Sequence, residues 1–279
     1  MKLNFIKMNP TENMTVLILN PLPRDKYIEI ANKIMNYNNL YAEQVGFIEK
    51  PERNNEEIGV RLHMMGGEFC CNASCALAAA LVDRNHYSVK TDGNKHLVKF
   101  EVSGADEDIL CEVSCPKNNK TYEAKIKMSL PKSIEEFYIN YKDEIYEGHL
   151  VKFPGIVHYV VSGVKEEDRI DFFKNFIEKS GLDNFEAIGI MFLREEDMFI
   201  TPLVYVRKTD SLVWERGCGS GSTATGIVKS YLLKKNAEIN VNQPGGTLKI
   251  STNWTDGKVS SVYLTGTVNM VAEGVLHID

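Results

Sequence analysis

The feature that most constrains this chain is a short motif that occurs twice, once in each half. A cysteine followed by small or cap-forming residues opens an apolar helix pattern at 70–76 and again at 218–224. Each motif follows a strand-like segment that carries Gly and Glu, and the two cysteines are separated by about half of the 279 residues. A chance match of short Ser-, Ala- and Gly-rich segments is the simpler alternative. We favour a duplicated αβ unit in which each copy presents one thiol at a helix N-terminus.

The composition is that of a soluble globular protein with length for one large domain or two small ones. Hydrophobic residues make up 43% and charged residues 25%, and the net charge is −6. No basic stripe and no apolar run of about 18 residues occurs, so neither nucleic acid nor a membrane is an expected partner. The first residues lack a signal-peptide core, and the 6 cysteines are too few for a disulfide scaffold. We therefore expect a cytoplasmic protein with free thiols.

Hydrophobic periodicity predicts a mixed chain of helices and strands. Helices are expected at 24–37, 70–84, 169–179 and 220–235. Strands are expected at 13–20, 44–49, 59–65, 97–102, 109–114, 122–128, 157–164, 187–193, 201–206, 211–215, 247–252, 259–265 and 268–275. No linker rich in Pro or Ser separates the halves, so a boundary near Pro131 follows from the repetition alone.

A helix N-terminus suits both a reactive thiol and a bound carboxylate. Its unpaired N–H groups and partial positive charge lower the pKa of a thiol and bind anions. Residues that can cap the helix or let a ligand approach its backbone follow both cysteines: Asn72, Ala73, Gly219, Ser220, Gly221 and Ser222. Two facing copies would hold one carboxylate with a thiol on each side of the attached carbon. That geometry fits inversion at an α-carbon, in which one thiolate removes a proton and the opposite thiol delivers another.

Other interpretations of these residues are weaker. The two Cys-x3-Cys spacings differ from the Cys-x2-Cys pairs of structural zinc, so no metal is expected. The glycine-rich loop at 217–222 lacks the lysine of a phosphate-binding loop, and a cysteine hydrolase would need a histidine partner. His158 fits a core histidine better than a base. Cys75, Cys111 and Cys115 are expected to be packing residues.

With these motifs, the sequence resembles the diaminopimelate epimerase superfamily of cofactor-independent amino acid racemases. Within it, the sequence is most similar to the histidine racemase branch of opine-metallophore biosynthesis. The resemblance covers nearly the whole chain. Its segments are Asn9-Pro10 through Asn13-Met14-Thr15, Glu43–Glu49, Glu68–Ala73, Val157–Val160, Trp214-Glu215 with Cys218–Gly221, and Gln243–Gly246.

The resemblance implies an α+β, diaminopimelate-epimerase-like fold of two pseudo-symmetric lobes, each a β-barrel-like sheet around a central helix. The N-terminal lobe would span 1–128, completed by a C-terminal strand at 267–279, and the C-terminal lobe would span 129–266, with the active site in the cleft between them. Cys70 and Cys218 would be the catalytic acid/base residues. The substrate-binding residues would be Asn13, Gln44, Asn72, Ala73, Glu215, Gly219, Ser220 and Gly221. The helix ends would hold the α-carboxylate, and Glu215 would meet the α-ammonium.

The implied function is racemisation of an amino acid, a small-molecule substrate, without pyridoxal phosphate, another cofactor or a metal. A homodimer is compatible with the sequence. Two departures from the epimerase pattern favour histidine as substrate: Ile156 stands where epimerases have Asn, and the spacer before Cys218 is short. A distal ammonium and carboxylate would then lack partners, whereas an imidazole needs only a few hydrogen bonds. Epimerisation of diaminopimelate or lanthionine, a racemase of broader specificity and a non-catalytic amino-acid-binding protein stay open. The role of Cys71, where epimerases have Gly, also stays open.

Overall fold

The structure is a computed structural model, and it describes residues 1–53, 58–115, 120–182, 184–207 and 210–278. The fold is mixed and rich in sheet, with few helices. The chain divides into two compact units. Unit 1 consists of Met1–Lys127 and Thr265–Asp279, and unit 2 consists of Met128–Leu264. The predicted strand at 267–279 has its last residue outside the described part of the chain.

The strands of unit 1 pair in a mixed order. They are β1 (Lys2–Pro10), β2 (Thr15–Ile18), β3 (Gln44–Glu49), β4 (Arg61–Met64), β5 (Val89–Asp92), β6 (Lys95–Val102), β7 (Ile109–Ser114), β8 (Thr121–Met128) and the later part of β17 (Lys258–His277). β1 is antiparallel to both β17 and β2, β2 is parallel to β3, and β3 is antiparallel to β4. β4 is parallel to β6. β6 is antiparallel to β7, β7 is antiparallel to β8, and β8 also pairs with β17.

The strands of unit 2 follow a similar course. They are β9 (Ser133–Tyr141), β10 (Glu144–Lys152), β11 (Ile156–Ser162), β12 (Ala187–Arg194), β13 (Phe199–Val206), β14 (Ser211–Trp214), β15 (Ala237–Gln243), β16 (Gly246–Thr255) and the first part of β17. β9, β10 and β11 are antiparallel neighbours, β11 is parallel to β12, and β12 is antiparallel to β13. β13 is parallel to β15, which is antiparallel to β16.

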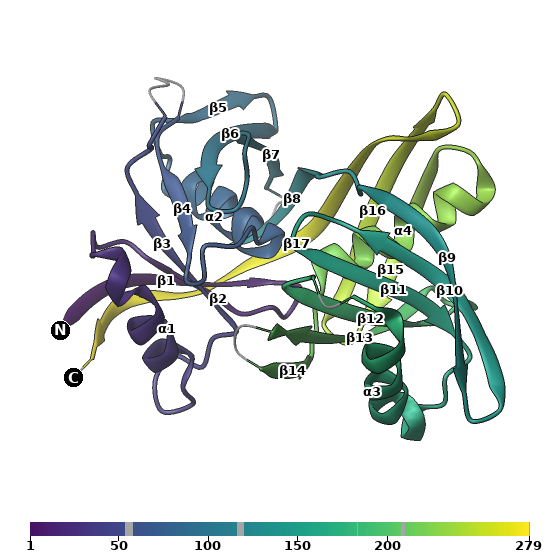
Figure 1. Cartoon of the computed structure of the whole chain (residues 1–279). Helices are drawn as coiled ribbons and strands as arrows, with labels where there is room; N and C mark the ends of the chain where they lie inside the picture. The colour runs from purple at the N-terminus through teal and green to yellow at the C-terminus, as the bar shows by residue number, and fades with distance from the viewer. Residues whose placement is uncertain (54–57, 116–119, 183, 208–209, 279) are drawn as a thin grey trace. The chain divides into compact units, whose positions relative to one another are not determined.

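The two units therefore repeat one order of strand pairings. The series β1–β2–β3–β4–β6 and the series β10–β11–β12–β13–β15 both alternate antiparallel, parallel, antiparallel, parallel. Parallel neighbours need a crossover connection, and each of these contains a helix. The helices are α1 (Tyr27–Met35), α2 (Cys71–Asp83), α3 (Arg169–Ser180) and α4 (Gly219–Leu233) (Figure 1). The two cysteine motifs thus begin equivalent crossover helices, α2 and α4.

Helix α2 is buried along almost its whole length, and α4 is buried over most of its length, although Leu232 and Leu233 at its end are exposed. Every residue of α2 from Cys71 to Val82 is buried, and the helix contacts β1, β2, β3, β6 and β7. The Gly-, Ser-, Thr- and Ala-rich α4 contacts β10, β11, β12, β15 and β16. A helix that is apolar or small-sided all round needs such enclosure to be stable. By contrast, α3 buries one phenylalanine stripe, Phe172, Phe173 and Phe176, and exposes its charged face.

The predicted helices and strands lie within a few residues of their expected positions, with two differences. The predicted strands 259–265 and 268–275 are one continuous strand, β17, because no turn-forming sequence interrupts the ladder between them. Strands β1, β5, β9, β10 and β15 were not predicted. β15 alternates apolar and polar residues, a pattern typical of a half-buried strand, whereas the pair Glu135-Glu136 interrupts the alternation in β9.

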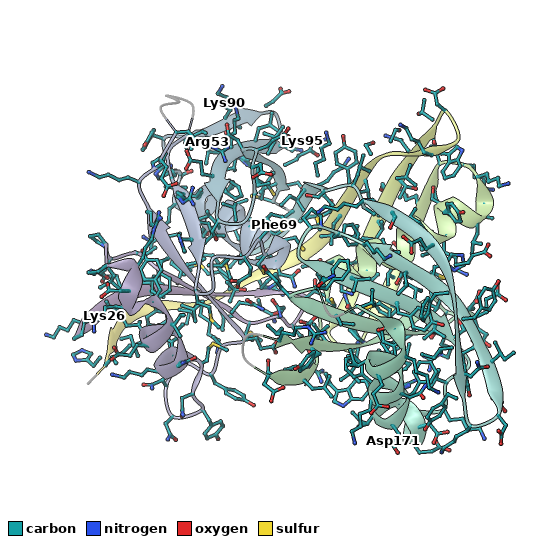
Figure 2. All side chains as sticks on the ribbon, viewed as in Figure 1. Lys26, Arg53, Phe69, Lys90, Lys95 and Asp171 are labelled. Atoms are coloured by element: carbon teal, nitrogen blue, oxygen red, sulfur yellow. The ribbon has the colours of Figure 1, made fainter. Side chains whose placement is uncertain are left out.

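Many charged side chains lie on the surface. Lys26, Lys90, Lys95 and Asp171 are exposed and project outward in Figure 2. In the part of the chain that the structure describes, no helix is both long and apolar enough to span a membrane.

Candidate active site

The two predicted catalytic cysteines occupy the same position at the start of equivalent helices. Cys70 is the N-cap of α2, and its Sγ accepts a hydrogen bond from the backbone N–H of Ala73, at 3.4 Å. Cys218 is the N-cap of α4, and its Sγ accepts from the N–H of Gly221, at 3.3 Å. Both cysteines have extended backbone angles, as N-cap residues do.

The two sulfur atoms therefore act as the N-terminal helix caps, because each accepts a hydrogen bond from a backbone N–H of the first turn. Asn72, Ser220 and Ser222 are residue types that can cap a helix, but the caps are the cysteines, because both helices begin directly after them. A thiol that accepts from the third N–H of a helix lies at its positive end. Each unit thus presents one sulfur atom at one helix N-terminus.

In unit 1, Asn13 and Gln44 lie at the start of two adjacent strands. Thr15 of β2 pairs with Gln44 of β3, and the N–H of Gln44 donates to the carbonyl of Met14. Asn13 is buried, and its Nδ2 donates to Glu43 Oε2 at 3.0 Å. Its Oδ1 is buried and has no hydrogen-bond partner among the described residues. Asn13 therefore retains an acceptor for a donor on a bound molecule.

The loop that leads into Cys70 is held by the two residues that follow β6. Ser103 Oγ donates to the carbonyl of Glu68 at 3.0 Å and accepts from the N–H of Met64 at 2.9 Å. Gly104 has φ +71°, and a Cβ there would lie 2.4 Å from the backbone N of Phe69. A residue with a side chain at 104 would push this loop away.

In unit 2, the neighbours of Cys218 come from three segments. Gln243, at the end of β15, accepts from the Cys218 N–H at 2.8 Å. The hydroxyl of Ser220 lies 3.7 Å from the sulfur and 2.8 Å from Nε2 of His158 on β11. Glu215, just before α4, hydrogen bonds the thiol through its carboxylate. The structure thus places Glu215 and Ser220 in contact with Cys218, and His158 and Gln243 also contact this group.

The pKa of Cys218 differs from the sequence-based expectation. The helix end was expected to lower it, but burial raises the pKa of this thiol well above its usual range, and the Glu215 carboxylate raises it further. The Gly221 N–H and the Ser220 hydroxyl act in the opposite direction. The side chain is only 4% exposed, so desolvation of the thiolate outweighs the two hydrogen bonds. Cys218 is therefore a thiol at neutral pH.

The other cysteines have different surroundings. Cys75 and Cys111 are buried, which confirms their predicted packing role, and a hydrogen bond with Cys111 and burial together raise the pKa of Cys75. Cys115 is exposed, so its predicted packing role is wrong. Cys71 is buried with its Sγ 3.9 Å from Asn72 Oδ1. No group of three His, Cys, Asp or Glu side chains that could hold a metal occurs among the residues with a described position.

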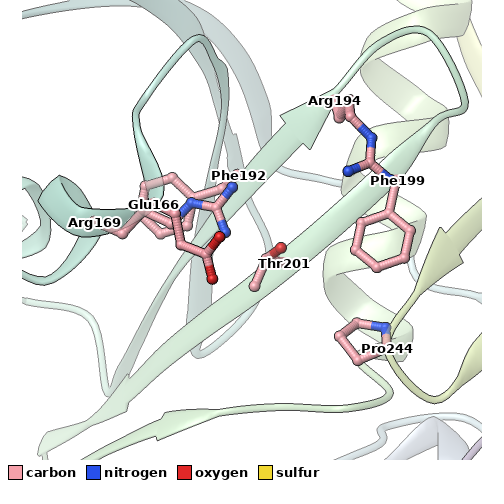
Figure 3. Close-up of a pocket in the computed structure, with 7 residues that line it drawn as sticks. All are labelled: Glu166, Arg169, Phe192, Arg194, Phe199, Thr201 and Pro244. Carbon is pink, nitrogen blue, oxygen red and sulfur yellow. The ribbon is translucent and has the colours of Figure 1, made fainter.

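Unit 2 also contains a pocket that sequence reasoning missed (Figure 3). Its volume is about 310 Å³, and none of the predicted site residues lines it. The Arg169 guanidinium lies 5.1 Å from the ring centre of Phe192, and that of Arg194 lies 4.8 Å from the ring centre of Phe199. Arg169 begins α3, Phe192 and Arg194 lie on β12, and Phe199 begins β13, so no single sequence motif marks the pocket.

His158, Gln243 and Glu43 hydrogen bond Ser220, Cys218 and Asn13, respectively, and were not among the predicted site residues. A signal existed for each of them, because all three lie in segments that carry the family resemblance. Spacing could not reveal their contacts, since β11, β15 and the start of α4 are far apart in sequence.

Comparison with known proteins gives one consistent family. The family described as histidine racemase CntK N-terminal domain matches residues 2–277. A histidine racemase of Fusobacterium nucleatum subsp. nucleatum is 37% identical over 286 residues, which cover 99% of this chain and 97% of that protein. A diaminopimelate epimerase of Methanocella arvoryzae is 26% identical over 291 residues, which cover 100% of this chain and 98% of that protein.

A similar fold is found among solved structures. The crystal structure of a probable proline racemase from Agrobacterium radiobacter matches with a TM-score of 0.70 at 10% identity, over 99% of this chain and 93% of that one. At this identity the likeness establishes the fold alone. From the family match and the 37% identical relative, the chain belongs to the histidine racemase CntK family and is an isomerase of the amino acid racemase type.

Proposed function

We propose that this protein is a histidine racemase that inverts Cα between the thiols of Cys70 and Cys218, without pyridoxal phosphate or a metal. The observation that carries the proposal is the equivalence of the two helix starts, each with a sulfur atom held by the N–H three residues on. The full-length match to a histidine racemase supports the substrate.

In the proposed reaction, the substrate carboxylate binds at the two helix ends. The N–H groups of Ala73 and Gly221 already donate to the thiols. The backbone at Asn72, Gly219 and Ser220 is then the proposed source of donors to the carboxylate. Inversion requires that one carbon is reached by one thiol on each of its two faces.

The proton balance needs no other reactant. One cysteine, as thiolate, takes the Cα proton, and the other, as thiol, delivers its proton to the opposite face, so the two exchange protonation states in each turnover. Donors at the carboxylate stabilise the enolate-like charge that develops. Cys218 is suited to begin as the proton donor because its pKa is raised. Once deprotonated, a thiolate of raised pKa is also a stronger base toward a weak carbon acid.

The proposed substrate contacts are Asn13, Gln44 and Glu215. The buried Oδ1 of Asn13 has no partner among the described residues and suits an N–H of the substrate. Glu215 is proposed to meet the α-ammonium, which would also neutralise the charge that now raises the pKa of Cys218.

Three further features complete the proposal. Each unit is proposed as one β-barrel-like lobe around its buried helix, α2 or α4, with the active site in the cleft between the lobes. We place the reaction in the cytoplasm, because two catalytic thiols need a reducing compartment. A monomer and a homodimer are both compatible with this mechanism.

Diaminopimelate epimerisation is the second candidate, because a diaminopimelate epimerase matches the whole chain at 26% identity. Ile156, the first residue of β11, and the contact of Arg216 Nη2 with the carbonyl of Pro244 argue against a clamp for a distal carboxylate.

The test is solvent exchange at Cα in D2O, followed by NMR, with L-histidine, L-lysine and LL-diaminopimelate at equal concentration. We expect exchange and racemisation of histidine with the highest kcat/KM. A preference for diaminopimelate would support the second candidate, and binding of histidine without exchange would reject catalysis.

A further inference from the structure

We infer that His158 is a positioning residue that orients the hydroxyl of Ser220 so that its proton points at Cys218 Sγ. The catalytic consequence of this arrangement rests on the proposed function, but the arrangement itself can be tested on the thiol alone.

The three side chains form a continuous chain of contacts. His158 Nε2 lies 2.8 Å from Ser220 Oγ, and Ser220 Oγ lies 3.7 Å from Cys218 Sγ. Both distances are within the range of a hydrogen bond to oxygen and to sulfur, respectively. His158 comes from β11, which contacts α4, whereas the other two residues belong to the start of α4.

The sheet provides space for this imidazole ring. In the parallel pair of β11 and β12, His158 lies next to Gly189. A Cβ at position 189 would lie 2.4 Å from Nδ1 of His158. A side chain there would displace the ring, so the glycine is needed for the contact between His158 and Ser220.

The position of the histidine proton follows from burial. Burial lowers the pKa of His158 to about 3, so the ring is neutral at pH 7 and carries one N–H. Nδ1 is buried and has no hydrogen-bond partner among the described residues. A buried N–H without a partner is rare and costly, so the hydrogen lies on Nε2 and is donated to Ser220 Oγ.

This donation decides where the serine proton goes. Because Ser220 Oγ accepts from His158, its own O–H is directed away from the ring, and Cys218 Sγ is the acceptor within reach. A hydroxyl fixed in this way stabilises the thiolate without adding a charge. The Ser220 hydroxyl and the Gly221 N–H both lower the pKa of Cys218. Burial and the carboxylate of Glu215, which lies in the segment before α4, both raise it.

The experiment measures the pH dependence of alkylation at Cys218 in the full chain. Iodoacetamide is added across neutral and alkaline pH, and modification is quantified by mass spectrometry on the peptide that contains Cys218, which separates it from the other cysteines. We expect Ser220→Ala and His158→Phe each to shift the profile upward by about one pH unit, a tenfold loss of thiolate at a given pH.

Two further variants separate positioning from a merely structural role. His158→Gln carries an amide N–H that can replace Nε2–H and should keep the profile of the original protein. His158→Asn, with equal polarity but a shorter side chain, cannot reach Ser220 and should behave like His158→Phe. The double variant His158→Phe, Ser220→Ala should match Ser220→Ala alone, because His158 acts through the serine. Thermal unfolding shows which variants fold, and Ser220→Ala, at a half-buried position, tests the hydroxyl even where a His158 variant does not fold.

An unchanged profile in Ser220→Ala, or additive shifts in the double variant, would overturn the inference. The alkylation profile does not depend on turnover. An upward shift in a protein that does not racemise histidine would therefore reject the proposed function and retain the positioning role.

Discussion

Substitution of Gly221 by alanine should damage the site at Cys218 more than the stability of the fold. Gly221 lies in the first turn of α4, and its N–H donates to Cys218 Sγ. A Cβ at this position would lie 2.1 Å from Met191 Sδ and 3.0 Å from Cys218 Sγ. Both contacts are shorter than van der Waals distances, so the two sulfur atoms have to move.

The magnitudes indicate which effect dominates. Alanine stabilises a helix by about 0.5–1 kcal/mol relative to glycine, whereas overpacking a core costs about 1–3 kcal/mol. The net loss of stability should therefore be no more than about 2.5 kcal/mol. Displacing the sulfur lengthens its hydrogen bond to the Gly221 N–H, and a bond to a charged group contributes about 1.5–3 kcal/mol. We expect kcat to fall roughly 10- to 150-fold.

Gly226→Ala is the matched control. Gly226 lies in the same helix, and a Cβ there would lie 2.4 Å from Cγ2 and 2.7 Å from Cβ of Ile250, so it is overpacked as severely, against an apolar side chain. Both variants should lower Tm in thermal unfolding, but only Gly221→Ala should lose turnover of histidine at a temperature where both are folded. Equal kcat values in the two variants would refute the argument that position 221 acts on the thiol.

Three other predictions follow from the same structure. Cys70→Ser and Cys218→Ser should each lower the rate of racemisation by about 10²–10⁴-fold. Each variant should still exchange the Cα proton of one enantiomer, because one base remains. Normal turnover in both directions would reject the two-base mechanism. Protonation of His158 should lower the free energy of unfolding by about 2 kcal/mol between about pH 7.5 and pH 5. The pKa of His158 is about 3 in the folded protein and higher in the unfolded chain, so the unfolded chain binds the proton first as the pH falls. In urea unfolding, His158→Gln should lack this pH-dependent loss of stability. Racemisation should survive a chelator and hydroxylamine but fall after mild oxidation and recover with reductant; loss on chelation would reject the metal-free proposal.

The sequence predicted all four α-helices and most of the strands, because the signals for these elements are local. The buried helices were recognisable from runs of small and apolar residues, and Gly181 ends α3 in the left-handed conformation, as expected of a terminal glycine. The strand order could not be predicted, because parallel pairs such as β4 with β6 and β13 with β15 depend on which segments meet after a crossover. The motif itself still marked where those crossovers begin.

The candidate site shows the same limit at the level of single residues. The position of Cys218 at a helix start was readable from the motif, and general rules for helix ends predicted a lowered pKa. The pKa of Cys218 is instead raised, because strands that contact α4 enclose the thiol and because the Glu215 carboxylate lies beside it. Neither cause can be recognised from the motif. A helix end stabilises a thiolate by a bounded amount, whereas full burial opposes any charge. The reactivity of such a thiol is therefore set by the few polar groups that the fold adds around it. For Cys218 those groups include the hydroxyl of Ser220, and a histidine 62 residues away in the chain is hydrogen bonded to that hydroxyl.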